Sequence, residues 1–134
     1  MEELEDDKII VQSLIGGSHF PFYLRCLKSL VTFCKDSIEL LLHSDGTLSK
    51  ADKDSIYSEF DGTFVSITNS SENTSNVLDC LQGRPNCQKI RKDSIWGIEF
   101  FDPIYAFPHE PISFYLDADI LFLRPFSGLF DRIE

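Results

Sequence analysis

Basic residues are scarce in this chain of 134 residues. It has 12 Lys and Arg against 22 Asp and Glu, which gives a formal net charge of −10. Nucleic acids and anionic membrane surfaces are bound by clusters of lysine and arginine. The shortage argues against both kinds of partner, and we expect no nucleic acid to bind this chain.

Long apolar runs are also missing. No run approaches the roughly 18–20 apolar residues that a membrane span requires. The opening MEELEDD is acidic, whereas a secretion signal has a basic start followed by an apolar core. We expect residues 1–7 to form a flexible acidic tail, and we predict a cytoplasmic protein with no transmembrane segment.

The four cysteines lack the spacing of a metal site. No CxxC pair occurs, and Cys26 and Cys34 lie on the apolar side of an expected helix. We therefore expect buried free thiols rather than zinc ligands or disulfides.

Apolar residues are plentiful. They make up 43% of the chain, with twelve Phe, which is enough for one packed core. No internal repeat or linker divides the chain, so we predict a single domain over residues 1–134.

Segments with the period of a strand alternate with segments of helical period in the first half of the chain. This βαβαβ order is typical of a parallel sheet with helices on its faces, so we predict an α/β, Rossmann-like fold. The expected strands are 8–17, 37–46 and 63–67, and the expected helices are 18–35 and 47–60.

The second half is expected to continue differently. Residues 68–76 are polar and predict a loop, and residues 91–107 show a helical stripe that Asp102-Pro103 should end or kink. We expect Trp96 on that stripe to be a core residue, with stacking against a bound molecule as the alternative. The final strand is expected in ISFYLDADILFL, residues 112–123.

Two aspartates interrupt this last apolar segment. Asp117 and Asp119 flank Ala118 near the carboxyl end of the expected strand, where ligands of parallel α/β sheets bind. Residues i and i+2 of a strand share a face, so both carboxylates can address one target. The alternative is structural: Asp117 caps a turn, and Asp119 pairs with Arg124.

Two neighbouring carboxylates repel each other unless a cation lies near them. A hard divalent ion such as Mg²⁺ or Mn²⁺ resolves this conflict and keeps positions open for phosphate oxygens. The Asp117-Ala118-Asp119 motif therefore favours a metal–diphosphate site over the structural alternative.

With these residues identified, the chain resembles the nucleotide-sugar-binding half of a GT-A-fold glycosyltransferase. FYLDADILFLRPFSGLF is similar to the DxD segment of the glycogenin-like and bacterial galactosyltransferase-like group. The resemblance implies transfer of a sugar from a nucleotide diphosphate donor, commonly a UDP-sugar, with Mn²⁺ or Mg²⁺ on the diphosphate. It implies that Asp119 is the principal metal ligand. Asp117 then binds the metal directly or through water and also approaches the ribose, and Ala118 belongs to the donor site as well.

The same resemblance places the nucleotide base over the ends of the first two strands. Leu14, Ile15 and Gly16 then line its pocket, and Asp45 accepts a hydrogen bond from the base. A simple turn at Asp45-Gly46 is the equal alternative for that residue. His43 is expected to be a hydrogen-bonded strand residue rather than a ligand.

A basic cluster of Lys89, Arg91 and Lys92 precedes the DxD segment, where the resembled family often places a cation that reaches the donor. We assign Arg91 and Lys92 to the donor site, with solvent-exposed charge at a helix end as the alternative.

The chain is shorter than such catalytic domains, so we expect a truncated domain that supplies the donor and metal half and is weak or inactive by itself. No catalytic residue can be assigned. Two other functions stay open: a haloacid-dehalogenase-like phosphatase with Asp117 as nucleophile, and a nucleotide-binding module without catalysis.

Overall fold

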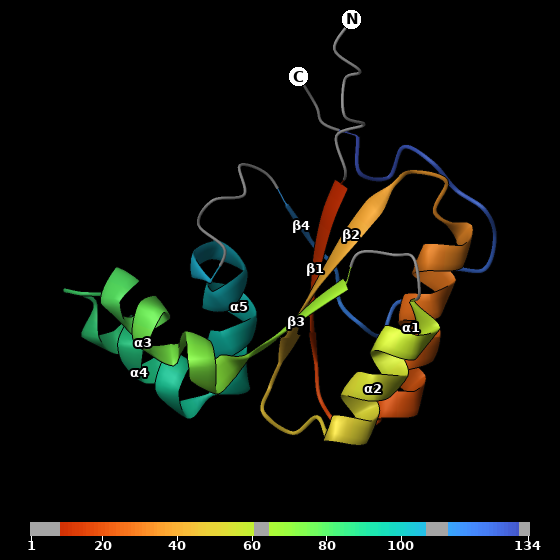
Figure 1. The fold of residues 1–134 in the computed structure, drawn as a ribbon. Helices are drawn as coiled ribbons and strands as arrows, with labels where there is room; N and C mark the ends of the chain where they lie inside the picture. Colours follow the sequence, from red (N-terminus) through yellow and green to blue (C-terminus); the bar gives the residue numbers. More distant parts are fainter. Residues whose placement is uncertain (1–8, 61–64, 107–112, 132–134) are drawn as a thin grey trace, which may run out of the picture.

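The computed structural model describes residues 9–60, 65–106 and 113–131. In these ranges the chain forms one sheet of four parallel strands with helices on both sides (Figure 1). The predicted α/β class with a parallel, Rossmann-like sheet is confirmed at this level. The acidic residues 1–7 lie outside the described ranges.

The sheet has the strand order β3-β2-β1-β4. The chain moves outward from β1 to β3 and then returns to place β4 on the other side of β1. Along its whole length β1 pairs with β2, whereas β4 joins β1 only at Phe114 and Tyr115. The elements are β1 (Ile9–Ile15), α1 (Phe20–Phe33), β2 (Ile38–Ser44), α2 (Lys50–Glu59), β3 (Val65–Asn69), α3 (Ser70–Cys80), α4 (Pro85–Asp93), α5 (Ile95–Tyr105) and β4 (Phe114–Tyr115).

One face of the sheet packs against α1 and α2 (Figure 1). The residues that fill this core alternate along the strands, as Val11 and Ile15 do in β1 and Leu40 and Leu42 do in β2. Ser49 begins α2 with a capping box, because its hydroxyl accepts from the Asp52 amide and Asp52 accepts from the Ser49 amide, each at 3.0 Å. The main hydrophobic core of the molecule therefore lies between this face and the two helices.

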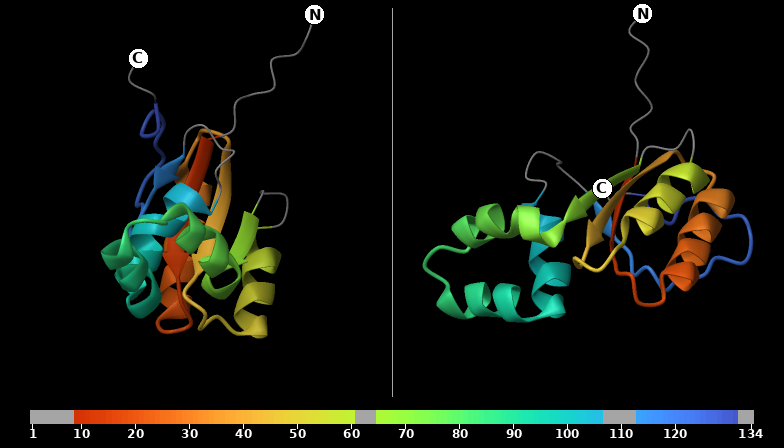
Figure 2. Two further views of the ribbon diagram at one scale, coloured as in Figure 1. Left: turned by 90° about the vertical axis from the view of Figure 1, so that its left-hand side faces the viewer. Right: turned by 60° about the horizontal axis from the view of Figure 1, so that its bottom comes forward.

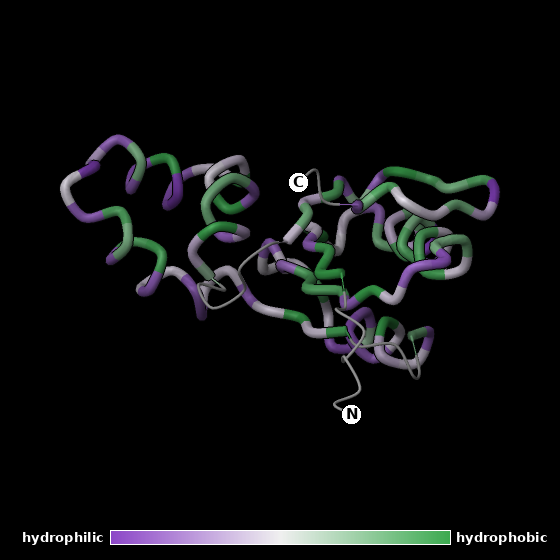
Figure 3. Tube along the Cα trace, turned by 90° about the horizontal axis from the view of Figure 1, so that it is seen from above, coloured by the Kyte–Doolittle hydropathy of each residue, from purple (hydrophilic) through white to green (hydrophobic). Residues whose placement is uncertain are grey.

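Helices α3, α4 and α5 form a second group on the other side of the sheet (Figure 2). A smaller core of Val77, Leu81 and Phe101 holds them together, and hydrophilic and hydrophobic residues alternate along them (Figure 3). Only α5 of this group contacts β1 extensively. None of the helices in the described ranges combines the length and apolar character that a membrane span needs.

The structure differs from the sequence-based expectation in three elements. Residues 68–76, expected to be a loop, contain most of α3, which Asn69 caps by accepting from the Ser71 amide at 3.2 Å. Helix α5 passes through Pro103 and ends at Tyr105. The expected strand 112–123 is paired only at β4, because the chain leaves the sheet before Asp117.

All four cysteines are free thiols, as predicted. Cys26 is buried, whereas Cys34 and Cys87 are half-buried and Cys80 is exposed. The expected burial is therefore wrong for Cys80 and incomplete for two others. Cys80 is the last residue of α3, a helix that the sequence pattern did not predict.

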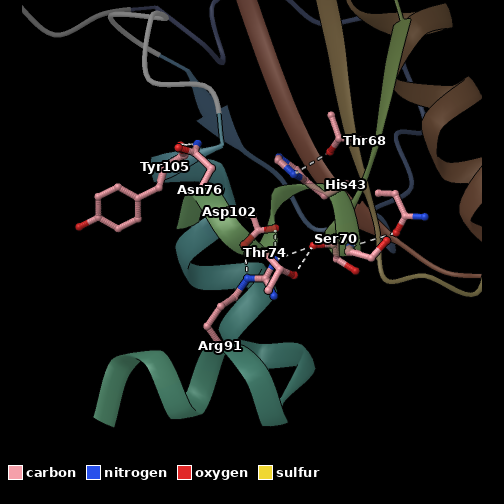
Figure 4. Close-up of polar contacts among 10 residues, drawn as sticks. His43, Thr68, Ser70, Thr74, Asn76, Arg91, Asp102 and Tyr105 are labelled. Carbon is pink, nitrogen blue, oxygen red and sulfur yellow. Dashed lines mark hydrogen bonds and ion pairs between the residues drawn. The ribbon is translucent and has the colours of Figure 1, made fainter. Parts of the chain in front are cut away.

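Polar side chains line the sheet face that is turned towards α5. The Gln12 amide nitrogen donates to the Pro103 carbonyl at 3.0 Å and to Ser113 Oγ at 2.6 Å. Its oxygen lies 2.6 Å from His43 Nε2, and Thr68 Oγ1 lies 3.4 Å from His43 Nδ1 (Figure 4). Gln12 thus offers an acceptor to Nε2, which fixes the proton on that nitrogen and leaves Nδ1 to accept from Thr68. The expected hydrogen-bonded strand histidine is confirmed.

Burial, with the charge of Arg91 as a second cause, lowers the pKa of His43 from 6.5 to about 4. The unfolded chain therefore binds a proton at His43 as the pH falls below 6.5, while the folded chain resists until about pH 4. We predict that His43 removes about 3 kcal/mol of the free energy of unfolding between pH 6.5 and pH 4. Urea denaturation at both pH values measures this loss.

The matched comparison uses two of the three histidines, His43 and His19. His43→Gln should lose this part of the pH dependence, whereas His19→Asn should keep it, because His19 is exposed and Asn tolerates its left-handed backbone. An identical pH profile for wild type and His43→Gln would contradict the prediction.

Candidate functional site

A pocket of about 370 Å³, which we call the DxD pocket, lies at the carboxyl ends of β1 and β4. It occurs where the strand order reverses, since the chain continues from β1 to β2 on one side and β4 flanks β1 on the other. Ligands of open parallel sheets bind at such a switch point. All of the sequence-predicted site residues except Arg91 and Lys92 line it: Leu14, Ile15, Gly16, Asp45, Asp117, Ala118 and Asp119.

The DxD residues lie in a turn directly after β4. Ser13 Oγ donates to the Leu116 carbonyl at 2.5 Å, and the Leu116 amide donates to the Gln12 carbonyl at 2.9 Å, which holds the start of this turn against β1. Ala118 is buried in the main core, while Asp117 and Asp119 on either side of it line the pocket. Both residues line one pocket, but a turn brings them there rather than the alternation of a strand.

The segment after the turn crosses α1. The Phe122 amide donates to Ser29 Oγ at 2.9 Å, and the Phe126 amide donates to the Phe33 carbonyl at 2.9 Å. The rings of Phe122 and Phe126 stack with centroids 4.5 Å apart. These contacts anchor the DxD turn from its far side.

The structural alternative for Asp119 required an ion pair with Arg124. Both residues belong to the described ranges, and the ion pairs found there do not include this one. The carboxylate of Asp119 therefore lines the pocket without that partner.

The glycines after β1 permit a close contact with the turn after β2. A Cβ on Gly16 would collide with the Asp45 carboxylate, and one on Gly17 would collide with the Thr47 carbonyl. Asp45 Oδ1 accepts from the Thr47 amide at 2.8 Å and from its hydroxyl at 2.6 Å, and the Thr47 hydroxyl accepts from the Gly17 amide at 2.7 Å. Asp45 is thus part of a turn, as one alternative expected, and it also lines the pocket wall. The hydrogen bond to a base stays a prediction.

His19 contributes an unusual backbone conformation to the pocket wall. It precedes α1 with φ 62° and ψ 21°, and among the described residues it is the non-glycine residue with positive φ. Such conformations cost free energy and are concentrated at functional sites. The strain accompanies the sharp turn from β1 into α1.

Glu99 is a pocket residue that the sequence reasoning missed. It projects from α5 into the DxD pocket, and Tyr115 Oη donates to its Oε1 at 3.2 Å. Burial raises the pKa of Glu99, the hydrogen bond from Tyr115 opposes this, and the charges of Asp117 and Asp119 raise it further. The sequence feature that could have identified Glu99 is that it is the one charged residue in the otherwise apolar run of residues 95–101.

Trp96 is not a core residue, contrary to expectation. Its side chain is 71% exposed, and it lines the DxD pocket one helical turn before Glu99. The apolar stripe of α5 is therefore wider than the part that the protein buries. An exposed indole beside a polar pocket offers an aromatic face to a ligand.

Arg91 is buried away from the DxD pocket. Its guanidinium makes two hydrogen bonds to the Asp102 carboxylate, at 2.5 and 2.9 Å, and a third to the Ser70 carbonyl at 2.9 Å (Figure 4). Burial raises the pKa of Asp102, an effect that the hydrogen bonds and charge of Arg91 oppose. This ion pair joins α3, α4 and α5 and explains the burial of Arg91 without a ligand.

Lys92 lines a neighbouring cavity of about 390 Å³, where Arg91 also forms part of the wall. The cavity shares Asp45 and Ile95 with the DxD pocket. The structure thus does not bring Arg91 and Lys92 together with the two DxD carboxylates. The basic cluster lies in α4, with Arg91 and Lys92 in its last turn, rather than opening α5.

The DxD pocket is strongly acidic. Its described wall includes the carboxylates of Asp45, Glu99, Asp117 and Asp119, with His19 as the residue that can become cationic. Oxygen ligands of this kind suit Mg²⁺ or Mn²⁺. In residues 9–60, 65–106 and 113–131, no group of three His, Cys, Asp or Glu side chains could hold a metal ion. A cation in this pocket would take at most two side chains of these kinds from the described residues and would need water or ligand oxygens to complete its shell.

Comparisons with protein-family models, with curated proteins and with solved structures find no match for this chain. The site is therefore interpreted from its own residues.

We predict that Asp102→Asn lowers the free energy of unfolding by about 3–5 kcal/mol, because it leaves the Arg91 charge buried without a carboxylate. The double variant Arg91→Met/Asp102→Leu should lose less, since no buried charge remains. Urea denaturation measures both. Asp93→Asn is the control, because it removes the exposed pair with Lys89 on the same helix and should have little effect.

A loss in Asp102→Asn as small as in Asp93→Asn would contradict the structural role of the buried pair.

Proposed function

We propose that this chain binds a nucleoside diphosphate sugar in the DxD pocket and supplies the donor and metal half of a GT-A-fold glycosyltransferase. The supporting observation is the position of Asp117 and Asp119, which line the pocket at the switch point between β1 and β4. Parallel sheets with this order place ligands there. UDP-sugars are the expected donor class.

The acidity of the pocket gives this proposal a clear requirement. A diphosphate carries negative charge and would be repelled by the carboxylates of the pocket wall, so it needs a cation between them. Asp119 is proposed as the principal ligand of Mn²⁺ or Mg²⁺, with Asp117 binding directly or through water. The ion supplies Lewis-acid chemistry that offsets charge on the departing diphosphate.

The nucleoside is proposed to lie over the end of β1. Leu14, Ile15 and Gly16 line this part of the pocket, and Ala118 leaves room for the ribose because its side chain is small and buried. Asp45 Oδ1 accepts from Thr47, so Oδ2 is the oxygen proposed to accept from the base. Binding and orientation of the donor are thus distributed over residues that β1, β2 and β4 position.

We predict that UDP and Mn²⁺ together raise the melting temperature of the full chain more than either does alone. A ligand at 100 times its Kd stabilises the folded state by about 2.7 kcal/mol, which corresponds to roughly 10 °C for a domain of this size. Differential scanning fluorimetry over a series of UDP concentrations measures the shift.

The carboxylate is tested by Asp119→Asn, which should abolish the joint shift. Asp54→Asn has the same charge change on the exposed surface of α2 and should keep it. The proposal fails if no nucleoside diphosphate gives a metal-dependent shift, or if Asp119→Asn behaves like Asp54→Asn. Stabilisation by beryllium fluoride and Mg²⁺ in place of UDP would favour the phosphatase alternative.

A further inference from the structure

A second hollow follows α5 beside the DxD pocket, and we call it the α5 groove. It has a volume of about 720 Å³, and its wall includes Ile90, Trp96, Phe100, Pro103, Ile104 and Tyr115. Phe100 is 66% exposed and Ile104 is 54% exposed. A volume of this size is typical of sites for small molecules.

The α5 groove and the DxD pocket adjoin each other. Trp96, Glu99 and Tyr115 line both. The hydrogen bond from Tyr115 Oη to Glu99 Oε1 therefore lies at the junction of the two hollows. A molecule in the groove can place one end beside the proposed donor site, and the groups that it meets there are a carboxylate and a phenol.

The polarity of the groove restricts its ligand. The hydrogen-bonding side-chain groups in its described wall are the Glu99 carboxylate, the Tyr115 hydroxyl and the Trp96 indole N–H, and all three residues lie at the junction. A free sugar lying along the groove would lose hydrogen bonds to water without replacing them, which is costly. An alkyl or aryl group would instead gain by covering exposed aromatic and aliphatic side chains.

The groove wall is held in place from behind. A Cβ on Gly97 would collide with the backbone of Ile90 and Arg91, so α4 and α5 are in close contact. The ring of Phe101 meets Phe100 edge to face at 5.0 Å, and Asp102 bonds the buried Arg91. A preformed apolar surface binds with little loss of conformational entropy.

We propose that the acceptor of the sugar is amphipathic: its hydroxyl lies at Glu99 and Tyr115, and its alkyl or aryl group lies in the α5 groove. This inference rests on the proposed function, because it takes the neighbouring pocket as the donor site. It adds the chemical class of the acceptor, a hydroxyl compound or glycoside with an apolar tail.

The chain provides its own reporter for a test. Trp96 is its one tryptophan, and it lies at the junction with 71% of its side chain exposed. Octyl β-glucoside below its micelle concentration is the probe, and glucose is the control without an apolar tail. We expect a saturable blue shift of Trp96 emission with octyl glucoside and none with glucose.

Variants locate the bound tail. Phe100→Ser and Ile104→Ser should each weaken octyl glucoside binding about tenfold, because they remove apolar contact area. Leu123→Ser is the matched control: Leu123 is 80% exposed in another apolar hollow that shares no residue with the DxD pocket. It should leave binding unchanged. Circular dichroism and melting temperatures show that each variant is folded.

Several results would overturn the inference. These are no saturable shift, equal binding by Phe100→Ser and wild type, or a Trp96 emission that changes with protein concentration in step with dimerisation seen by ultracentrifugation. The last would assign the groove to a second copy of the chain. UDP–Mn²⁺ stabilisation in the same samples separates the two proposals: if it persists while octyl glucoside fails, only the acceptor class is wrong.

If octyl glucoside binds but UDP–Mn²⁺ stabilisation is absent, the groove is not an acceptor site, because the donor site on which it depends is missing.

Discussion

The placement of the DxD turn depends on the buried amide of Gln12. From the central strand β1, this side chain bonds His43 of β2, Ser113 before β4 and the Pro103 carbonyl of α5. Since β4 contributes only two paired residues, backbone pairing alone fixes it weakly. The Gln12 side chain adds a contact that positions the start of β4, and because Gln12 is buried, each of its hydrogen bonds would be costly to leave unmade.

The two faces of the sheet differ in composition and in role. The face against α1 and α2 is apolar and supplies most of the buried hydrophobic area. The face against α5 is polar at Gln12 and His43, and it orients a helix whose side chains reach the rim of the sheet at Trp96 and Glu99. Stability resides mainly on one side, and the candidate chemistry is concentrated at the edge of the other.

Local sequence signals sufficed for the parallel sheet and for the position of Asp117 and Asp119 near a strand end. The resemblance to GT-A-fold enzymes, rather than a local signal, grouped Gly16 and Asp45 with them. The metal and donor assignments stay predictions. Helix α3 could not be predicted, because it buries only Ser70 and Val77, and two residues do not make a helical stripe in the sequence. Contacts between residues distant in sequence could not be predicted either.

The same limitation explains the other misassignments. Arg91 was assigned to the donor site, with solvent-exposed charge as the alternative, because its buried partner Asp102 belongs to the next helix and the sequence did not pair them. Trp96 looked like core because it belongs to a largely apolar helical stripe, but Ile95 and Phe100 on that stripe are exposed as well. Pro103 stays helical where its carbonyl accepts from Gln12. Ser13 and Leu116, which join β1 to the DxD turn, are 103 residues apart. A ribosome must therefore synthesise β1, β2 and β3 before it reaches the residues of the DxD turn, and this pairing cannot form until then.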